Sequence, residues 1–538
     1  MYPYKIAGIL LLPLSLAMTA AAQTAPAPAP NPAPQSPPTT SNQAAPPAQV
    51  PSGQAQPPSA QPGQSDKPVT RITPDQAKEL FASVGKILQF ASDDTKLPIR
   101  HEVKSKLTTR PEVEKYLVDK MNDDKDAKRM ERSEIVLKKF GLLDADFHLR
   151  TFLVQLLDEQ IAAYYDSKTK TVNLLDWIDP ATQKPVLAHE LTHALQDQHV
   201  NLDKWENLTS DDLSHSYAED KKHVATDEDD TSREAVLEGQ AMAVFVDYSL
   251  APIHQTLRNS SPQMLDKLLE GMTDDSDSPV LTRAPLLLQE SLLFPYKDGL
   301  KFEATLMGDS KDSGAAFAGV LDRPPDSSFE IMNPRAYEQK VAVPLLKMPD
   351  IHPVIDAQYN PYDIGVMGEL DVRILSELFG GSQAAAELTP AWDGGLYYAA
   401  QKKAAPDKSS TSSVSLLYLS QWKSPDAAED FVKMYSNELS HKYTHVKRDN
   451  EAETSQDEQI YQTNEGPVLI VTSGNEVFIS ESFDLNTARK LQLVMLGAQQ
   501  QSGNQVASMR ASPSADLSGS MVRFMAGCGM MKAALPHH

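Results

Sequence analysis

Residues 185–200 have the sequence PVLAHELTHALQDQHV, which has helical periodicity and no helix breaker after Pro185. On a helix, positions i and i+4 lie on one face, so His189 and His193 can both direct a ring nitrogen at a single metal ion. Glu190 then lies beside that ion, where its carboxylate can take a proton from a metal-bound water and pass it to a leaving amine. This HExxH spacing predicts a catalytic Zn2+ ion, with Glu190 as the general base.

A catalytic zinc ion needs a third protein ligand, and two side chains could supply it. His199 has the spacing of the HExxHxxGxxH pattern, but Gln196 occupies the position where a Gly would end the helix. A continued helix would carry His199 about 15 Å along the axis from His189, out of reach of the metal. Glu238, in the predicted helix REAVLEGQA at 233–241, is the other candidate.

Glu234 lies one helical turn before Glu238 and competes with it for this role. Its milder function would be to accept a hydrogen bond from the ring N–H of a ligand histidine. Either carboxylate could instead be a charge on the helix surface. The small residues Gly239 and Ala241 favour Glu238, because they would let its helix pack closely against the HExxH helix.

Several motifs between residues 159 and 337 resemble those of gluzincin-type zinc metallopeptidases of the MA clan, and more narrowly an uncharacterised group of exported bacterial proteins. These motifs are EQIAAYYDSKTKTVNLL at 159–175, LAHELTHALQDQH at 187–199, AVLEGQA at 235–241, FPYKDG at 294–299 and PPDSSFEIMNP at 324–334. The resemblance implies that His189, His193 and Glu238 bind zinc and that Glu190 is the base. It also implies that a hairpin at 162–175 belongs to a sheet whose edge holds an extended peptide substrate.

One departure from the family concerns the group that stabilises the oxyanion. The family tends to have His where this chain has Asn333. Asn333 itself, a tyrosine such as Tyr165, or a weaker arrangement would have to replace that donor, which usually contributes several kcal/mol to the transition state. Tyr164, His215 and His223 fit packing or a solvated loop better. Two alternatives to an endopeptidase stay open: a catalytically weak or inactive binding or chaperone-like module, and a zinc hydrolase of non-peptide amides.

The patterns on either side predict an α+β fold. A mainly helical, zincin-like metallopeptidase domain with a small edge sheet is expected at 69–345, followed by a small α+β domain of unknown role at 346–500. Helices are expected at 72–91, 110–121 and 127–140, from residue 146 onward, and at 231–250, with Thr231 or Ser232 as the cap of the last and an acidic loop at 210–231 before it. Strands are expected at 413–422, 459–464, 467–473 and 476–483, and helices at 425–443 and 486–499.

The ends of the chain have a different composition. Residues 1–22 resemble a secretory signal peptide, although a membrane anchor is the competing interpretation, and we expect an exported, periplasmic or secreted protein. The stretch 23–68 holds 14 of the 39 prolines and predicts an extended linker, whereas 501–538 predicts a disordered tail. The formal charge of −23 argues against nucleic acid as a partner. We therefore expect a peptide or protein substrate and no transmembrane segment in the mature chain.

Two other patterns look like metal sites but lack the required spacing. His441 and His445 stand at i and i+4 without a Glu between them, which indicates an exposed helix end. The acidic runs at 211–212, 227–230 and 274–277 lack the central Gly and closing Glu of an EF-hand loop. These runs are predicted to be solvated loops.

Overall fold

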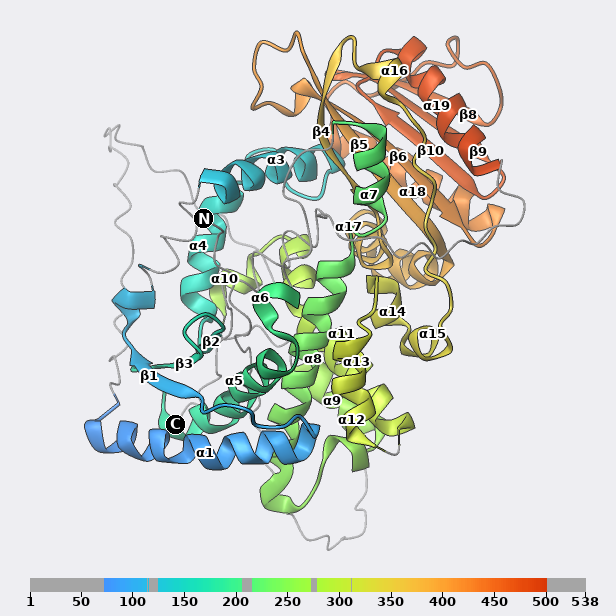
Figure 1. The fold of residues 1–538 in the computed structure, drawn as a ribbon. Helices are drawn as coiled ribbons and strands as arrows, with labels where there is room; N and C mark the ends of the chain where they lie inside the picture. Colours follow the sequence, from blue (N-terminus) through green and yellow to red (C-terminus); the bar gives the residue numbers. More distant parts are fainter. Residues whose placement is uncertain are drawn as a thin grey trace, which may run out of the picture. The chain divides into compact units, whose positions relative to one another are not determined.

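The computed structural model describes residues 72–113, 115, 124–205, 215–271, 278–310 and 312–500. The predicted signal peptide, proline-rich linker and C-terminal tail lie outside the described residues, as does most of the helix predicted at 110–121. The described part contains many helices and two separate sheets, which confirms the α+β class (Figure 1). None of its helices is both long and apolar enough to cross a bilayer.

The smaller sheet has three strands in the order β1-β3-β2. Strand β1 (Lys104–Thr108) is parallel to β3 (Thr171–Leu175), and β3 is antiparallel to β2 (Ala163–Asp166). The Asp166 carboxylate accepts hydrogen bonds from the backbone N–H groups of Lys168 and Thr169, which closes the turn between β2 and β3. The predicted hairpin is therefore confirmed, with β2 at an edge of the sheet.

Helices make up most of the described residues before 345. Thr73 caps α1 (Pro74–Thr95), and its side chain accepts a hydrogen bond from the Gln76 N–H, as the Thr-Pro-Asp sequence predicts. The other helices of this part are α3 (Asp124–Phe140), α4 (Leu149–Gln160), α5 (Pro180–Val200), α6 (Leu202–Trp205), α7 (Tyr217–Val224), α8 (Asp229–Leu250), α9 (Pro262–Gly271), α10 (Pro279–Thr282), α11 (Leu286–Asp309), α12 (Ser313–Ala316), α13 (Ala318–Asp322), α14 (Ser328–Met332) and α15 (Pro334–Gln339), with short 3-10 turns at Ala251–Ile253 and Leu257–Asn259.

Three predictions in this part were wrong: a helix that Pro185 opens, an acidic loop over 210–231 and a helix that begins at residue 231. Helix α5 begins before Pro185, because the Asp179 side chain caps it by accepting a hydrogen bond from the Ala181 N–H. Helix α7 lies inside the stretch predicted to be an acidic loop, and the Ser216 side chain caps it. Helix α8 begins at Asp229, since the Ser232 hydroxyl donates to the backbone oxygens of Asp229 and Pro325 and does not cap the helix.

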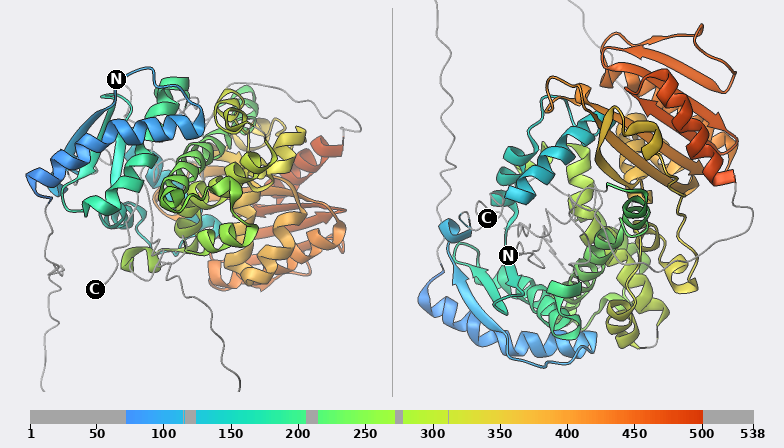
Figure 2. Two further views of the ribbon diagram at one scale, coloured as in Figure 1. Left: turned by 90° about the horizontal axis from the view of Figure 1, so that it is seen from below. Right: turned by 45° about the horizontal axis from the view of Figure 1, so that its top comes forward.

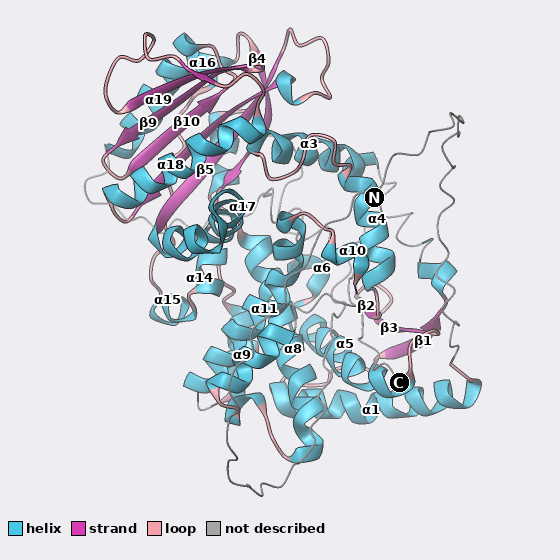
Figure 3. Ribbon diagram, turned by 180° about the vertical axis from the view of Figure 1, so that it is seen from behind, coloured by secondary structure: helices cyan, strands magenta, loops and turns pink. Residues whose placement is uncertain are grey.

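The larger sheet is antiparallel, with seven strands in the order β4-β5-β6-β10-β9-β8-β7 (Figure 3, magenta). The strands are β4 (Tyr359–Val366), β5 (Trp392–Lys402), β6 (Val414–Trp422), β7 (Lys447–Arg448), β8 (Glu458–Thr463), β9 (Gly466–Ser473) and β10 (Glu476–Glu481). The helices are α16 (His352–Ile355), α17 (Glu369–Leu388), α18 (Pro425–Lys442) and α19 (Leu485–Gln500), with 3-10 turns at Thr389–Ala391 and Thr411–Ser413. The predicted strands and the helices at α18 and α19 are confirmed, whereas β4, α17 and β5 were not predicted.

Helices α18 and α19 pack on opposite faces of this sheet (Figure 2, orange to red). Along β6, Leu416 and Tyr418 join the hydrophobic core that contains α18, and Leu417 and Leu419 join the core that contains α19. The first of these cores also contains the buried residues of α1, α5, α8 and α11. One hydrophobic core is therefore continuous across the domain boundary expected near residue 345.

Candidate metal centre

Helix α5 carries the HExxH motif through the interior of the protein. Every residue from Val186 to Asp197 is buried, and both histidines are fully buried. A helix that is buried on all sides packs against other elements around its whole circumference. Helix α8, which carries Glu238, is one of those elements. The motif therefore does not lie on a surface helix, and a chance HExxH on an exposed face is excluded.

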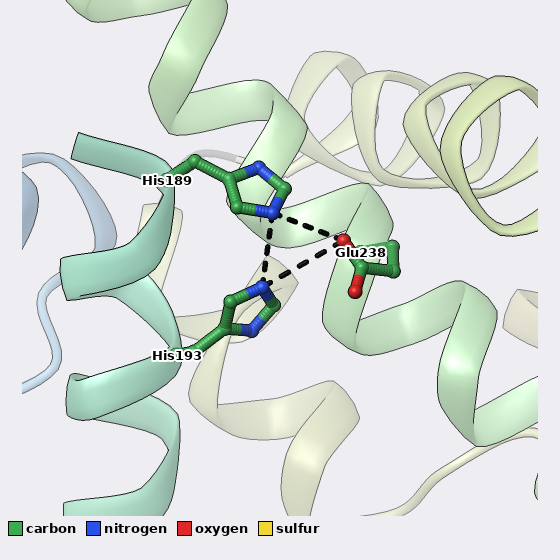
Figure 4. Close-up of side chains that lie close together, drawn as sticks. All are labelled: His189, His193 and Glu238. Carbon is green, nitrogen blue, oxygen red and sulfur yellow. Dashed lines mark hydrogen bonds and ion pairs between the residues drawn. The ribbon is translucent and has the colours of Figure 1, made fainter. Parts of the chain in front are cut away.

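Three side-chain atoms from these two helices converge (Figure 4). The Nε2 atoms of His189 and His193 are 3.0 Å apart. The Glu238 Oε2 atom lies 3.0 Å from the Nε2 atom of His189 and 3.6 Å from that of His193. Among the described residues, this is the one group of three or more His, Cys, Asp or Glu side chains with the geometry to hold a metal ion.

The spacing and the chemistry of this group fit a small cation. Bonds of about 2.0–2.1 Å in a tetrahedral site place neighbouring ligand atoms about 3.3 Å apart, close to the three distances observed. Burial, and to a smaller extent His193, lowers the pKa of His189 far below its usual range, so this imidazole is neutral and offers a lone pair. Burial raises the pKa of Glu238 well above its usual range, because no positive charge compensates the buried carboxylate and the hydrogen bonds with Glu234 and Tyr296 offset only part of the increase. A cation would supply that charge.

Glu190 is fully buried beside the same group. Burial raises the pKa of its carboxyl well above the usual range, and the charge of Glu238 adds to the increase. The backbone N–H of Tyr165, on edge strand β2, acts in the opposite direction through a hydrogen bond. Glu190 is therefore close to Glu238 and to the backbone of strand β2.

Tyr296 is a site residue that the sequence analysis missed. Its hydroxyl group hydrogen-bonds Glu238, and its ring stacks on His189 with 6.5 Å between ring centroids and 24° between ring planes. The signal in the sequence was FPYKDG, but the motif gave no reason to choose its tyrosine. Pro295 lies inside helix α11, and the neighbouring Tyr296 is directed at the metal-ligand group.

Two glutamines were also missed. The Oε1 atom of Gln196 lies 2.8 Å from His193 Nδ1, and its Nε2 atom donates to Gln240 Oε1 over 3.0 Å. In the sequence, Gln196 stood out only as a departure from the Gly of another pattern. Its contact with His193 depends on helix α5 continuing through that position, which the glutamine permits.

The other side chains proposed for the site form hydrogen bonds with residues outside the metal-ligand group. His199 Nε2 lies 2.9 Å from Asp322 Oδ1 at the end of α5, in agreement with the geometric argument against it as a ligand. The Asn333 side-chain amide donates to the backbone oxygen of Phe329 and to Glu369, over 2.9 and 2.6 Å. The Tyr165 hydroxyl donates to Asp197 over 2.7 Å. Asn333 and Tyr165 would each have to exchange these partners to reach an oxyanion.

Glu234 forms its hydrogen bond with Glu238 rather than with a ligand histidine. Two carboxyl groups at hydrogen-bonding distance share a proton unless a cation intervenes. Glu234 therefore contacts the third ligand of the group.

The histidine pair at 441 and 445 and the acidic runs, which lack the spacing of a metal site, were predicted with different success. His441 has a side chain that is 76% exposed and pairs with Glu438, as expected for a helix end. The run at 227–230 is buried, and Asp227 Oδ2 accepts a hydrogen bond from the Val366 N–H, so the prediction of a solvated loop there was wrong. The runs at 211–212 and 274–277 lie outside the described residues.

Comparisons with known proteins found no matching family model, no matching curated protein and no matching solved structure.

Proposed function

We propose that the protein is an exported zinc-dependent endopeptidase in which Glu190 is the general base. The observation that carries the proposal is the convergence of two imidazole nitrogens and one carboxylate oxygen from α5 and α8, with Glu190 next to His189 in the sequence. Two His and one Glu are a typical ligand set of catalytic zinc, which leaves a fourth position for water. Residues 1–22 support export.

Zinc, when bound, would polarise the substrate carbonyl group and lower the pKa of a water molecule. Glu190 takes the proton from that water as attack begins and later delivers it to the leaving amine. Its burial in a site of low dielectric makes the carboxylate a stronger base than it would be in water. The products are a new carboxyl terminus and a new amino terminus.

The position of β2 as an end strand of the small sheet supports a peptide as the substrate. Because β2 pairs only with β3 in the small sheet, its other side offers main-chain N–H and C=O groups to an extended chain. The N–H of Tyr165 on that side acts on Glu190. A peptide added to this edge would therefore run past the base.

The test combines metal analysis with digestion of a peptide library. The wild-type protein should contain about one zinc ion per chain and cleave library peptides. Glu190→Gln should keep the metal and lose about 10²–10⁴-fold in rate, because it removes proton transfer alone. His193→Ala should lose both metal and activity, since two ligands hold zinc weakly.

Two results would contradict the proposal: a wild-type protein that contains no zinc, or proteolysis that Glu190→Gln leaves unchanged. A protein that binds zinc and cleaves no peptide would instead favour a binding module without turnover. The hydrogen bond that Asn333 donates to Glu369 favours this second candidate function. Hydrolysis of non-peptide amides by the zinc-loaded protein would instead indicate the other alternative, a zinc hydrolase of such amides.

A further inference from the structure

A chain of hydrogen bonds leads from His193 into the protein interior through two buried glutamines. The Gln196 Nε2 group donates to the backbone oxygen of Leu237 over 3.1 Å and to Gln240 Oε1 over 3.0 Å. The Gln240 Nε2 group donates to the backbone oxygens of Ala316 and Phe317 over 3.2 and 3.1 Å. Both glutamine side chains are fully buried.

The backbone oxygens determine the direction of every bond in this chain. A carbonyl oxygen can only accept, so the atom facing each of the three backbone oxygens must be the amide nitrogen. The two N–H hydrogens of Gln196 are both used, by Leu237 and Gln240, whereas the Gln240 side chain also hydrogen-bonds the buried Glu303 carboxyl group. Gln196 therefore presents its oxygen, an acceptor without hydrogen, to His193 Nδ1 at 2.8 Å. The hydrogen in this contact has to come from the imidazole.

We propose that Gln196 and Gln240 are positioning residues that keep His193 in the tautomer with hydrogen on Nδ1. In that tautomer Nε2 carries the lone pair, and Nε2 is the atom that faces His189 and Glu238. The opposite tautomer would place an N–H at the metal position and leave the oxygen of Gln196 without a donor. This proposal adds positioning residues to the site of the proposed function. It rests on that function only in taking the bound metal to be the catalytic zinc.

This chain of hydrogen bonds differs from ordinary packing, because it connects the Nδ1 atom of His193 to three separate parts of the fold. Gln196 belongs to α5 and Gln240 to α8, and the two final acceptors lie at the junction of α12 and α13. A glutamine held by the backbone at its nitrogen cannot rotate by 180° without losing those bonds. The orientation of the histidine is thus determined by backbone that lies well outside the motif.

The experiment uses the full-length protein in its metal-free and zinc-loaded forms. Nitrogen NMR of histidine-labelled apoprotein reports which ring nitrogen of His193 carries hydrogen, with His193→Asn to assign the signal. Competition with a chelator measures the affinity for Zn2+ alone. Wild type should show hydrogen on Nδ1. Gln196→Leu should give mixed tautomers and bind zinc about 10–100-fold more weakly.

Gln196→Glu should keep the wild-type tautomer, because either carboxylate oxygen can accept the Nδ1 hydrogen, even though the bonds donated to Leu237 and Gln240 are lost. Gln240→Leu should shift the tautomer in the same direction as Gln196→Leu by a smaller amount, and it serves if the first variant does not fold. Gln183→Leu is the matched control. This buried glutamine on the same helix donates to the backbone oxygens of Leu175 and Ile178, so its loss should lower stability and leave zinc affinity and the tautomer unchanged.

The inference is overturned if Gln196→Leu retains the Nδ1 hydrogen and the affinity of wild type, or if Gln183→Leu weakens zinc binding as much as Gln196→Leu does. The tautomer of the apoprotein is independent of turnover. A protein with the expected tautomer and zinc affinity that cleaves no peptide would therefore contradict the proposed peptidase and support the positioning role.

Discussion

Glu238 has neighbours of three kinds within a fully buried space: two imidazoles, the carboxyl group of Glu234 and the phenol of Tyr296. The HExxH spacing predicted the two imidazole ligands. Glu238, on the next predicted helix, was the favoured third ligand. Tyr296 could not be found in this way, because it lies 58 residues beyond Glu238 and no local period relates the two positions. Its hydroxyl reaches Glu238 only because α11 packs along α8.

Tyr296→Phe should weaken zinc binding about tenfold while leaving the fold intact. The substitution keeps the ring that stacks on His189 and removes the hydrogen bond that orients the ligand carboxylate. Chelator competition measures the affinity. Tyr337→Phe is the control, since the Tyr337 hydroxyl donates to the backbone oxygen of Arg323 and belongs to the same part of the chain. A similar loss of affinity in both variants would show that any buried hydroxyl has this effect.

The crossing of α8 and α11 depends on a pair of glycines. A Cβ atom on Gly239 would lie 2.3 Å from the backbone carbon and oxygen of Gly299, a distance that no packing adjustment of side chains can relieve. Gly239 was expected to let α8 approach the HExxH helix, and that prediction named the wrong neighbour, because the glycine faces α11. Helix α8 therefore presents Glu238 to α5 while its adjacent glycine contacts α11.

Gly239→Ala should destabilise the fold by about 3 kcal/mol or more, because two helix backbones must move apart. The same movement would shift Tyr296 away from Glu238, so zinc affinity should fall with stability. Chemical denaturation of the metal-free protein measures the first effect. Gly85→Ala, in α1, is the matched control: its Cβ would meet nothing within 4 Å, so the higher helix propensity of Ala should raise stability by about 0.5–1 kcal/mol. Equal effects of the two substitutions would contradict the packing argument.

At the scale of the whole molecule, the chain after residue 345 is tied to the helices of the metal centre. Glu228, directly before α8, accepts hydrogen bonds from the hydroxyls of Ser327 and Ser328 in PPDSSFEIMNP, and the Ser328 oxygen accepts one from the Leu370 N–H of α17. Arg373 of α17 forms two hydrogen bonds with Asp298, at 3.1 and 3.0 Å, in the FPYKDG motif. Both motifs thus contribute contacts that hold α8 and α11 in place, in addition to any part they have in chemistry.

His352 provides a titratable contact of this kind. Its ring nitrogens lie 3.1 Å from Asp220 of α7 and 3.1 Å from Asp356. Burial lowers the pKa of His352, but hydrogen bonds and charges of Asp356 and Asp220 outweigh it and raise the pKa above 6.5. Because the folded pKa is raised, the stability that His352 contributes is complete below pH about 6.5 and is lost as pH rises through the folded value.

We therefore expect the difference in unfolding free energy between wild type and His352→Gln to be largest near pH 6 and to shrink toward pH 9. Urea denaturation at a series of pH values measures it. Glu330 and Glu369, whose pKa values burial raises to about 7, titrate in both proteins and cancel in the difference. A difference that stays constant or grows with pH would contradict the assignment of charge to His352.

The sequence by itself determined the features that depend on local spacing. Two histidines four positions apart on a helix must share a face, a turn held by Asp166 must join two strands, and a short apolar run such as 416–419 predicts a buried strand. The tertiary structure alone decided how segments distant in the chain meet. It brought Tyr296 to Glu238, Gln240 to Gln196 and Gly299 to Gly239. These contacts arise from the packing of whole helices, whose relative rotation and depth no local period specifies.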